Sequence, residues 1–166
     1  LEAARKGPAV VMTPGEYCYL DHYQDAPITQ PNAQGGYVTL EKAYGYEPLP
    51  DSCRTPQTEA CVEGLQGNLW TEYVPTPQHL EYMLYPRALA LAEVGWTSGH
   101  RNYAKFRKRA LYAVDFLQQK GYHTFDLAHE VGDRKEFRYG MKHEALHKKV
   151  TYLSSYAPKY RAEGDS

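Results

Sequence analysis

The sequence predicts an α/β fold with parallel strands. Two short apolar segments, 9–12 and 62–70, are typical of buried strands, because each is brief and lies near glycine or proline. Two longer segments, 77–96 and 102–120, repeat their apolar residues at helical spacing. The order of strand, long loop, strand, helix and helix indicates a parallel α/β layer. Two parallel strands are not stable alone, so we expect this chain to be part of a larger α/β fold.

A long polar stretch separates the two expected strands. The first strand, 9–12, is ended by Pro14 and Gly15, and the second, 62–70, contains glycines that suit the close approach of another backbone. Residues 21–59 between them hold prolines and glycines throughout, and this length exceeds that of ordinary connections. Long structured loops of this kind are expected to be functional or to contain short helices.

The helices are predicted from their caps and their apolar faces. Thr76 suits an N-cap, and Pro77 suits the first helical position. Pro86 lies inside the same pattern, so it should kink the helix or divide it in two. A second helix is expected over about 102–120, with Gly121 after its end. The faces that these helices should bury consist of Leu80, Met83, Leu84, Ala88, Leu91, Ala92, Phe106, Ala110, Ala113, Val114 and Leu117.

Length and charge indicate about one globular domain and exclude several classes of protein. The chain has 166 residues, with 19 Lys and Arg against 20 Asp and Glu. It therefore lacks the basic excess that a dedicated nucleic-acid binder needs. No apolar run is long enough to span a membrane, and no signal peptide is visible in this chain. Residues 1–99 are acidic overall and residues 100–166 are basic, which suggests two parts with different roles.

Cysteine and histidine spacing gives little support for a redox or metal centre. The three cysteines show no C-x-x-C spacing, and only Cys53 and Cys61 could pair across a short loop. His143-Glu144-x-x-His147 fits the zinc-peptidase pattern, in which two histidines bind the metal and the glutamate polarises water. Lysines flank this motif closely and no third histidine follows it, so a zinc peptidase is the less favoured alternative.

Aromatic and acidic residues follow both expected strands. Tyr19 and Asp21 come after the first strand, and Trp70 and Glu72 close the second. Ligand sites of α/β barrels are built at the carboxyl ends of the strands, and strand alternation would send the two members of each pair in one direction. An aromatic face beside carboxylates suits a pyranose ring. The competing interpretation places Trp70 in the core and Glu72 at a helix start or in a salt bridge.

Two of these segments resemble a known family. Gly67–Tyr73 (GNLWTEY) and Glu81–Trp96, with its Tyr-Pro-Arg block, resemble the end of the catalytic barrel of family 20 β-N-acetylhexosaminidases. Val11–Pro14 with Tyr17–Asp21 resembles the preceding strand and loop of that family. The likeness covers about residues 8–120. It implies the C-terminal portion of a (β/α)₈ TIM barrel, namely its last two strand–helix units.

The resemblance also implies a division into domains. Residues 1–124 would form the C-terminal quarter of the catalytic barrel. Residues 125–166, which alternate charges with Tyr and His, would form a linker and the beginning of an accessory C-terminal domain. The resemblance thus assigns the zinc-peptidase motif to the linker, which further weakens the metal interpretation.

The function implied by the resemblance is hydrolysis of terminal N-acetylglucosamine or N-acetylgalactosamine from glycans. The mechanism would be retaining and substrate-assisted, with the acetamido oxygen of the sugar as nucleophile and no cofactor or metal. Tyr19 would orient the acetamide, Asp21 and Glu72 would hold sugar hydroxyls in the −1 subsite, and Trp70 would line that subsite. Members of the family are commonly exported, so a periplasmic or secreted location is expected from the resemblance alone.

One departure from the family limits this expectation. The family's general acid lies in an adjacent Asp-Glu pair on an earlier barrel strand, and this sequence contains no such pair. We therefore expect the proton donor to lie outside these residues and the chain alone to be inactive. Its partners would be N-acetylhexosaminide glycans and the remainder of the barrel, without which it should self-associate through open edges. The alternative function is a non-catalytic carbohydrate-binding module, which the abundance of tyrosine favours.

Overall fold

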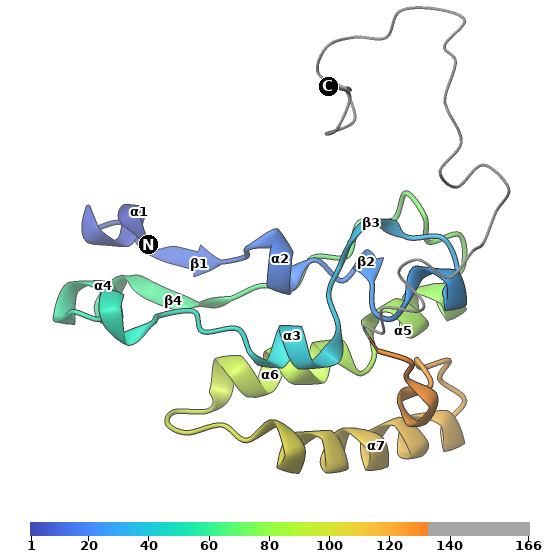
Figure 1. The fold of residues 1–166 in the computed structure, drawn as a ribbon. Helices are drawn as coiled ribbons and strands as arrows, with labels where there is room; N and C mark the ends of the chain where they lie inside the picture. Colours follow the sequence, from blue (N-terminus) through green and yellow to red (C-terminus); the bar gives the residue numbers. More distant parts are fainter. Residues whose placement is uncertain (133–166) are drawn as a thin grey trace, which may run out of the picture.

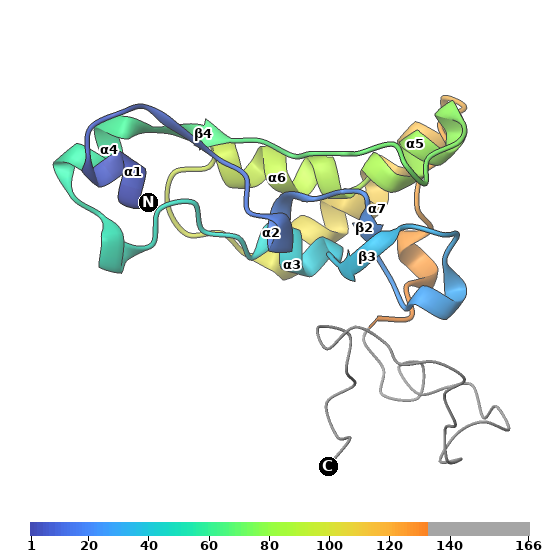
Figure 2. The same cartoon turned by 90° about the horizontal axis from the view of Figure 1, so that it is seen from above.

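The computed structural model describes residues 1–132, in which a strand layer covers a layer of helices (Figure 1). Seen from above, strands β1 and β4 run side by side over helix α6, and helix α7 lies beyond it (Figures 1 and 2). In chain order the elements are α1 (Glu2–Arg5), β1 (Val10–Met12), α2 (Gly15–Cys18), β2 (His22–Tyr23), η1 (Pro27–Thr29), β3 (Gln34–Tyr37), α3 (Leu40–Tyr44), η2 (Asp51–Cys53), α4 (Pro56–Cys61), β4 (Val62–Leu65), α5 (Pro77–Leu84), α6 (Arg87–Trp96), α7 (Tyr103–Gln119) and η3 (Leu127–His129).

Strands β1 and β4 form a parallel pair, as the sequence predicted. Val10 lies opposite Val62 and Met12 opposite Leu65. The second strand is shorter than expected, because the one-turn helix α2 removes the pairing partner of the residues that follow Leu65. Pairing resumes at a single parallel bridge between Tyr19 and Asn68. The two chain segments thus remain neighbours well beyond the regular strands.

The long polar stretch contains short elements, as expected. It forms a second parallel pair, β2 with β3, and the short helices η1, α3, η2 and α4. Gly36 in β3 has a φ of +120°, which favours glycine, and a Cβ built there would lie 2.5 Å from Nδ1 of His22. The sharp return of β3 therefore brings its backbone directly against the His22 ring.

The predicted helices are confirmed, but Leu80 and Ala92 of their predicted buried faces are exposed. Helix α5 begins after Thr76, whose hydroxyl accepts a hydrogen bond from the His79 N–H at 3.1 Å. Pro86 divides the pattern into α5 and α6, and the Tyr85–Pro86 peptide bond is cis. Helix α7 begins after Asn102, whose side chain caps it. Gly121 follows its end with a positive φ.

The core lies between the strand-end segments and helices α3, α6 and α7. Tyr44 of α3 stacks on Phe106 of α7 with ring centroids 4.4 Å apart, and its hydroxyl donates to Glu93 of α6 at 2.9 Å. Phe125 and Leu127 are buried in the same core. The packed body therefore extends past residue 124, while the assignment of the following residues to an accessory domain stays a prediction.

The cysteines at residues 18, 53 and 61 are all free thiols. Cys18, at the end of α2, is fully buried, and burial raises the pKa of its thiol to about 11. Cys61 donates to the carbonyl of Gly7 at 3.2 Å. Among the helices of residues 1–132, none has the length and apolar character needed to cross a bilayer.

Asp25 ties the end of the described chain to the long loop. Its buried carboxylate accepts hydrogen bonds from the N–H groups of Ala26 at 2.8 Å, Val131 at 2.8 Å and Gly132 at 2.7 Å. The two latter donors lie more than a hundred residues away in the sequence. A single side chain therefore fixes the position of residues 131–132.

We expect Asp25→Ala to lower the free energy of unfolding by about 3 kcal/mol, because three N–H groups lose a charged acceptor. Denaturant titration of the purified protein measures this. Asp126→Ala is the matched control, since Asp126 is exposed and pairs with His129 at the surface. Equal stability of the two variants would contradict the role assigned to Asp25.

Candidate functional site

The bridge between Tyr19 and Asn68 brings the two predicted site segments together. The Leu20 N–H donates to the Asn68 carbonyl at 2.6 Å, and the Asn68 N–H donates to the Cys18 carbonyl at 2.8 Å. Tyr19 therefore lies beside the residues that precede Trp70. The carboxyl ends of β1 and β4 meet at one edge, as the sequence predicted.

Asp21 is buried, with 4% of its surface exposed. Its carbonyl accepts from the Gln34 N–H at 3.0 Å, and its carboxylate oxygen Oδ1 has no hydrogen-bond partner among the described residues. The expected strand alternation from Tyr19 to Asp21 is wrong, because residues 20–21 form a turn in which the His22 N–H approaches the Tyr19 carbonyl at 3.4 Å. The two side chains are placed by this turn rather than by a pleat.

Trp70 and Glu72 lie on the exposed loop that follows β4. Trp70 is 55% exposed, so its placement in the core of this chain is wrong. Glu72 lies in a turn closed by the Val74 N–H and the Thr71 carbonyl at 3.1 Å. It is exposed and lies before the start of α5, so it is not a helix-start residue. Aromatic and acidic surface thus remains free next to the Tyr19 segment.

His22 is an additional residue of this site that the sequence did not single out. Its ring lies 5.6 Å from the Tyr19 ring, centroid to centroid, and packs against the backbone of Gly36. Burial lowers the pKa of His22; the Asp21 carboxylate opposes this effect, and the charges of Arg87 and Lys42 add to it. His22 therefore supports the Tyr19 ring as a neutral side chain.

Arg87 is the second site residue that sequence reasoning missed. It is fully buried at the start of α6, and its guanidinium donates only to main-chain carbonyls, four of them. Two of these belong to Leu20 and His22, on either side of Asp21. The available signal was one charged residue directly after Pro86 at the head of the apolar run 88–92.

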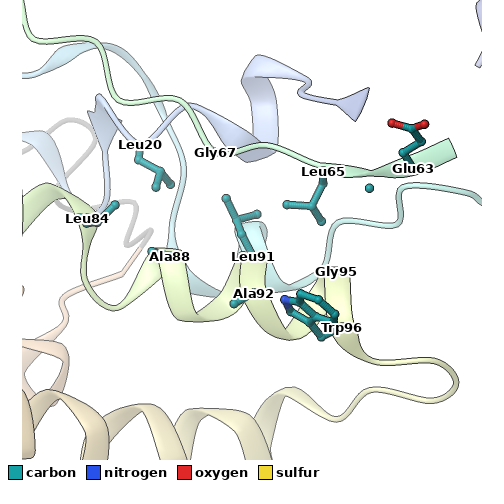
Figure 3. Close-up of a pocket in the computed structure, with 11 residues that line it drawn as sticks. Leu20, Glu63, Leu65, Gly67, Leu84, Ala88, Leu91, Ala92, Gly95 and Trp96 are labelled. Carbon is teal, nitrogen blue, oxygen red and sulfur yellow. The ribbon is translucent and has the colours of Figure 1, made fainter. Parts of the chain in front are cut away.

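A groove lies elsewhere, between β4 and α6 (Figure 3). Its volume is about 460 Å³, and Leu20, Leu65 and Leu91 point into it (Figure 3). Gly67 allows the loop after β4 to approach α6, because a Cβ there would lie 2.9 Å from Leu91. Trp96 at the groove's end is 91% exposed. The predicted site residues Tyr19, Asp21, Trp70 and Glu72 do not line this groove.

The metal interpretation has no support in the described residues. Within residues 1–132, no three His, Cys, Asp or Glu side chains are grouped so that they could hold a metal ion. The motif His143-Glu144-x-x-His147 lies outside the described residues. The zinc peptidase therefore stays an untested alternative.

Comparison with protein families gives one match, over residues 1–99, to the model described as glycosyl hydrolase family 20, catalytic domain. A β-hexosaminidase of Porphyromonas gingivalis is 40% identical over 141 residues, which cover 82% of this chain and 18% of that protein. One from Akkermansia muciniphila is 32% identical and covers 84% of this chain and 28% of its own length. The chain thus spans less than a third of the length of each of these relatives.

Solved structures show the same relationship. A family 20 exo-β-N-acetylglucosaminidase from Vibrio harveyi, crystallised with N-acetylglucosamine, superposes with a TM-score of 0.67 at 32% identity, covering 76% of this chain and 20% of that one. A Streptomyces coelicolor β-N-acetylhexosaminidase gives a TM-score of 0.64 at 25% identity, covering 75% and 25%. The predicted α/β fold is confirmed, and a partial barrel is consistent with these neighbours.

The depressed pKa of His22 leads to a testable pH dependence. Because the folded state favours the neutral ring, we expect the free energy of unfolding to be highest above the ordinary histidine pKa of 6.5. It should fall as the pH drops from there toward the lower pKa that His22 has in the folded state. His22→Gln should flatten this part of the profile. NMR titration of the imidazole and unfolding at several pH values measure both effects. A His22 ring that titrates at or above 6.5 would contradict this account.

Proposed function

Because the chain belongs to glycoside hydrolase family 20, we propose that it forms part of the catalytic domain of a β-N-acetylhexosaminidase. The whole enzyme would release terminal N-acetylglucosamine or N-acetylgalactosamine from glycans. The observation that supports this proposal is the bridge between Tyr19 and Asn68, which sets the chain segments after β1 and β4 beside each other. The names of the bacterial relatives support the same activity.

In this proposal each predicted residue has a role in the −1 subsite. The Tyr19 hydroxyl donates to the carbonyl of the substrate's acetamido group and holds its oxygen toward the anomeric carbon. Attack by that oxygen is then intramolecular and aligned, which is the largest advantage the site can supply without an enzyme nucleophile. Asp21 and Glu72 accept hydrogen bonds from sugar hydroxyls. The exposed ring of Trp70 provides the apolar wall.

The proton donor for the leaving group has to come from elsewhere in the enzyme. No adjacent Asp-Glu pair occurs in the sequence, and the residues assigned to the subsite bind sugar rather than protonate the glycosidic oxygen. We propose that this group lies in a part of the barrel outside these 166 residues. These residues would then bind substrate but not cleave it.

The alternative functions are weaker. A carbohydrate-binding module would more often be an all-β sandwich, whereas residues 1–132 form parallel strands covered by helices. A periplasmic or secreted location remains part of the proposal, supported by the bacterial origin of the relatives and the glycan substrate.

The subsite assignment predicts the effect of two substitutions in the whole enzyme. Tyr19→Phe removes only the hydroxyl, and Trp70→Ala removes the apolar wall. Each should lower kcat/KM on a nitrophenyl N-acetylglucosaminide at least about tenfold, equivalent to roughly 1.4 kcal/mol. Tyr112→Phe, on the exposed face of α7, is the control and should retain full activity. Unchanged rates for both site variants would exclude the assignment.

The open groove predicts self-association of the 166-residue chain when it is produced alone. The 91% exposed Trp96 and the apolar wall of α6 leave a surface that associates readily in water. Light scattering after size exclusion should show dimers or larger species. Trp96→Ser should shift the distribution toward monomer, whereas Tyr112→Ser should not. A compact and highly stable wild-type monomer would contradict the prediction.

A further inference from the structure

Arg87 joins four separate parts of the chain by hydrogen bonds. Its Nη1 donates to the carbonyls of His22 and Val38, both at 2.9 Å. Its Nη2 donates to the Met83 carbonyl at 2.7 Å and to the Leu20 carbonyl. A guanidinium can do this because its donors are fixed in one plane and point in different directions. Lysine, with one ammonium group, cannot reproduce the arrangement.

The acceptors of Arg87 flank the turn that carries Asp21. The carbonyls of Leu20 and His22 bind the guanidinium, and the carbonyl of Asp21 itself accepts from Gln34. Three consecutive carbonyls are therefore held from outside the turn. The direction of the Asp21 side chain depends on these contacts, since no regular strand fixes it.

The electrostatics link the same two residues. Burial lowers the pKa of Arg87, and the Asp21 carboxylate is the largest influence that opposes this effect. Arg87 donates its hydrogen bonds to carbonyl oxygens. The Asp21 carboxylate therefore balances the buried charge while its Oδ1 accepts no hydrogen bond from the guanidinium. Removing Arg87 alone would leave the Asp21 carboxylate without its counter-charge and four carbonyls without their donor.

We propose that Arg87 is a positioning residue that sets the place of the Asp21 carboxylate in the sugar subsite without taking up its Oδ1 in a hydrogen bond. The inference rests on the proposed function. It assigns to Arg87 no contact with substrate. Its effect on catalysis passes through Asp21.

A double-mutant cycle in the whole enzyme tests this role. Arg87→Lys keeps the charge but loses the planar donors, and Asp21→Ala removes the proposed hydroxyl acceptor. We expect each to lower kcat/KM about tenfold or more, chiefly through KM, and the double variant to lie within about threefold of Asp21→Ala. Arg101→Lys is the matched control, because Arg101 also donates to carbonyls, including that of Tyr46 at 2.7 Å, but away from the turn. Its effect should be small and additive.

The outcomes separate this inference from the proposed function. If Asp21→Ala is fully active, the subsite assignment and the role of Arg87 both fail. If Asp21→Ala is impaired but Arg87→Lys is neutral or simply additive with it, only the positioning role is overturned.

If Arg87→Lys does not fold, Gly36→Ala provides a second test, because its Cβ would collide with the His22 ring next to the same turn. It should also raise KM and be non-additive with Asp21→Ala. An unchanged KM for a folded Gly36→Ala would show that the turn's position does not matter, which overturns the inference.

Discussion

The parallel pairing of β1 with β4, continued by the bridge between Tyr19 and Asn68, is the constraint on which the rest of the structure depends. It sets two loops beside each other that are about fifty residues apart in the sequence. Helix α6 then packs beneath both loops, and Arg87 at its start reaches their carbonyls. The candidate site is thus positioned by the main-chain pairing of the two segments, and the Arg87 side chain adds to this by binding main-chain carbonyls of the segment after β1.

Local signals explain which elements could be predicted from the sequence. The cap at Thr76, the break at Pro86 and the stop at Gly121 act within a few residues of themselves, so the helices were found with nearly correct ends. Strand β4 was overestimated, because its pairing depends on α2, a single turn with no periodic signal. The β2–β3 pair was not predicted either, because its two short strands are defined by their contacts with each other rather than by their composition.

The site shows a similar division. Tyr19, Asp21, Trp70 and Glu72 were identified from position after a strand and from the family resemblance, and their roles stay predictions. The turn at Asp21 was missed, because alternation assumes an unbroken strand. Arg87 was missed because its side chain donates hydrogen bonds to main-chain carbonyls that are distant in the sequence. The positions of such carbonyls follow from the fold and cannot be read from residue types.

The state of Cys18 bears on the chemical robustness of the surface next to it. This thiol directly precedes Tyr19, yet it is fully buried. Because burial raises its pKa to about 11, the thiol stays protonated at neutral pH. Nucleophilic and oxidisable sulfur is thiolate sulfur in an accessible place. Electrophiles and peroxides that reach Tyr19 would therefore meet hydroxyl, imidazole and carboxylate groups instead. Oxidising or reducing surroundings should therefore not act on the proposed sugar-binding surface through the Cys18 thiol.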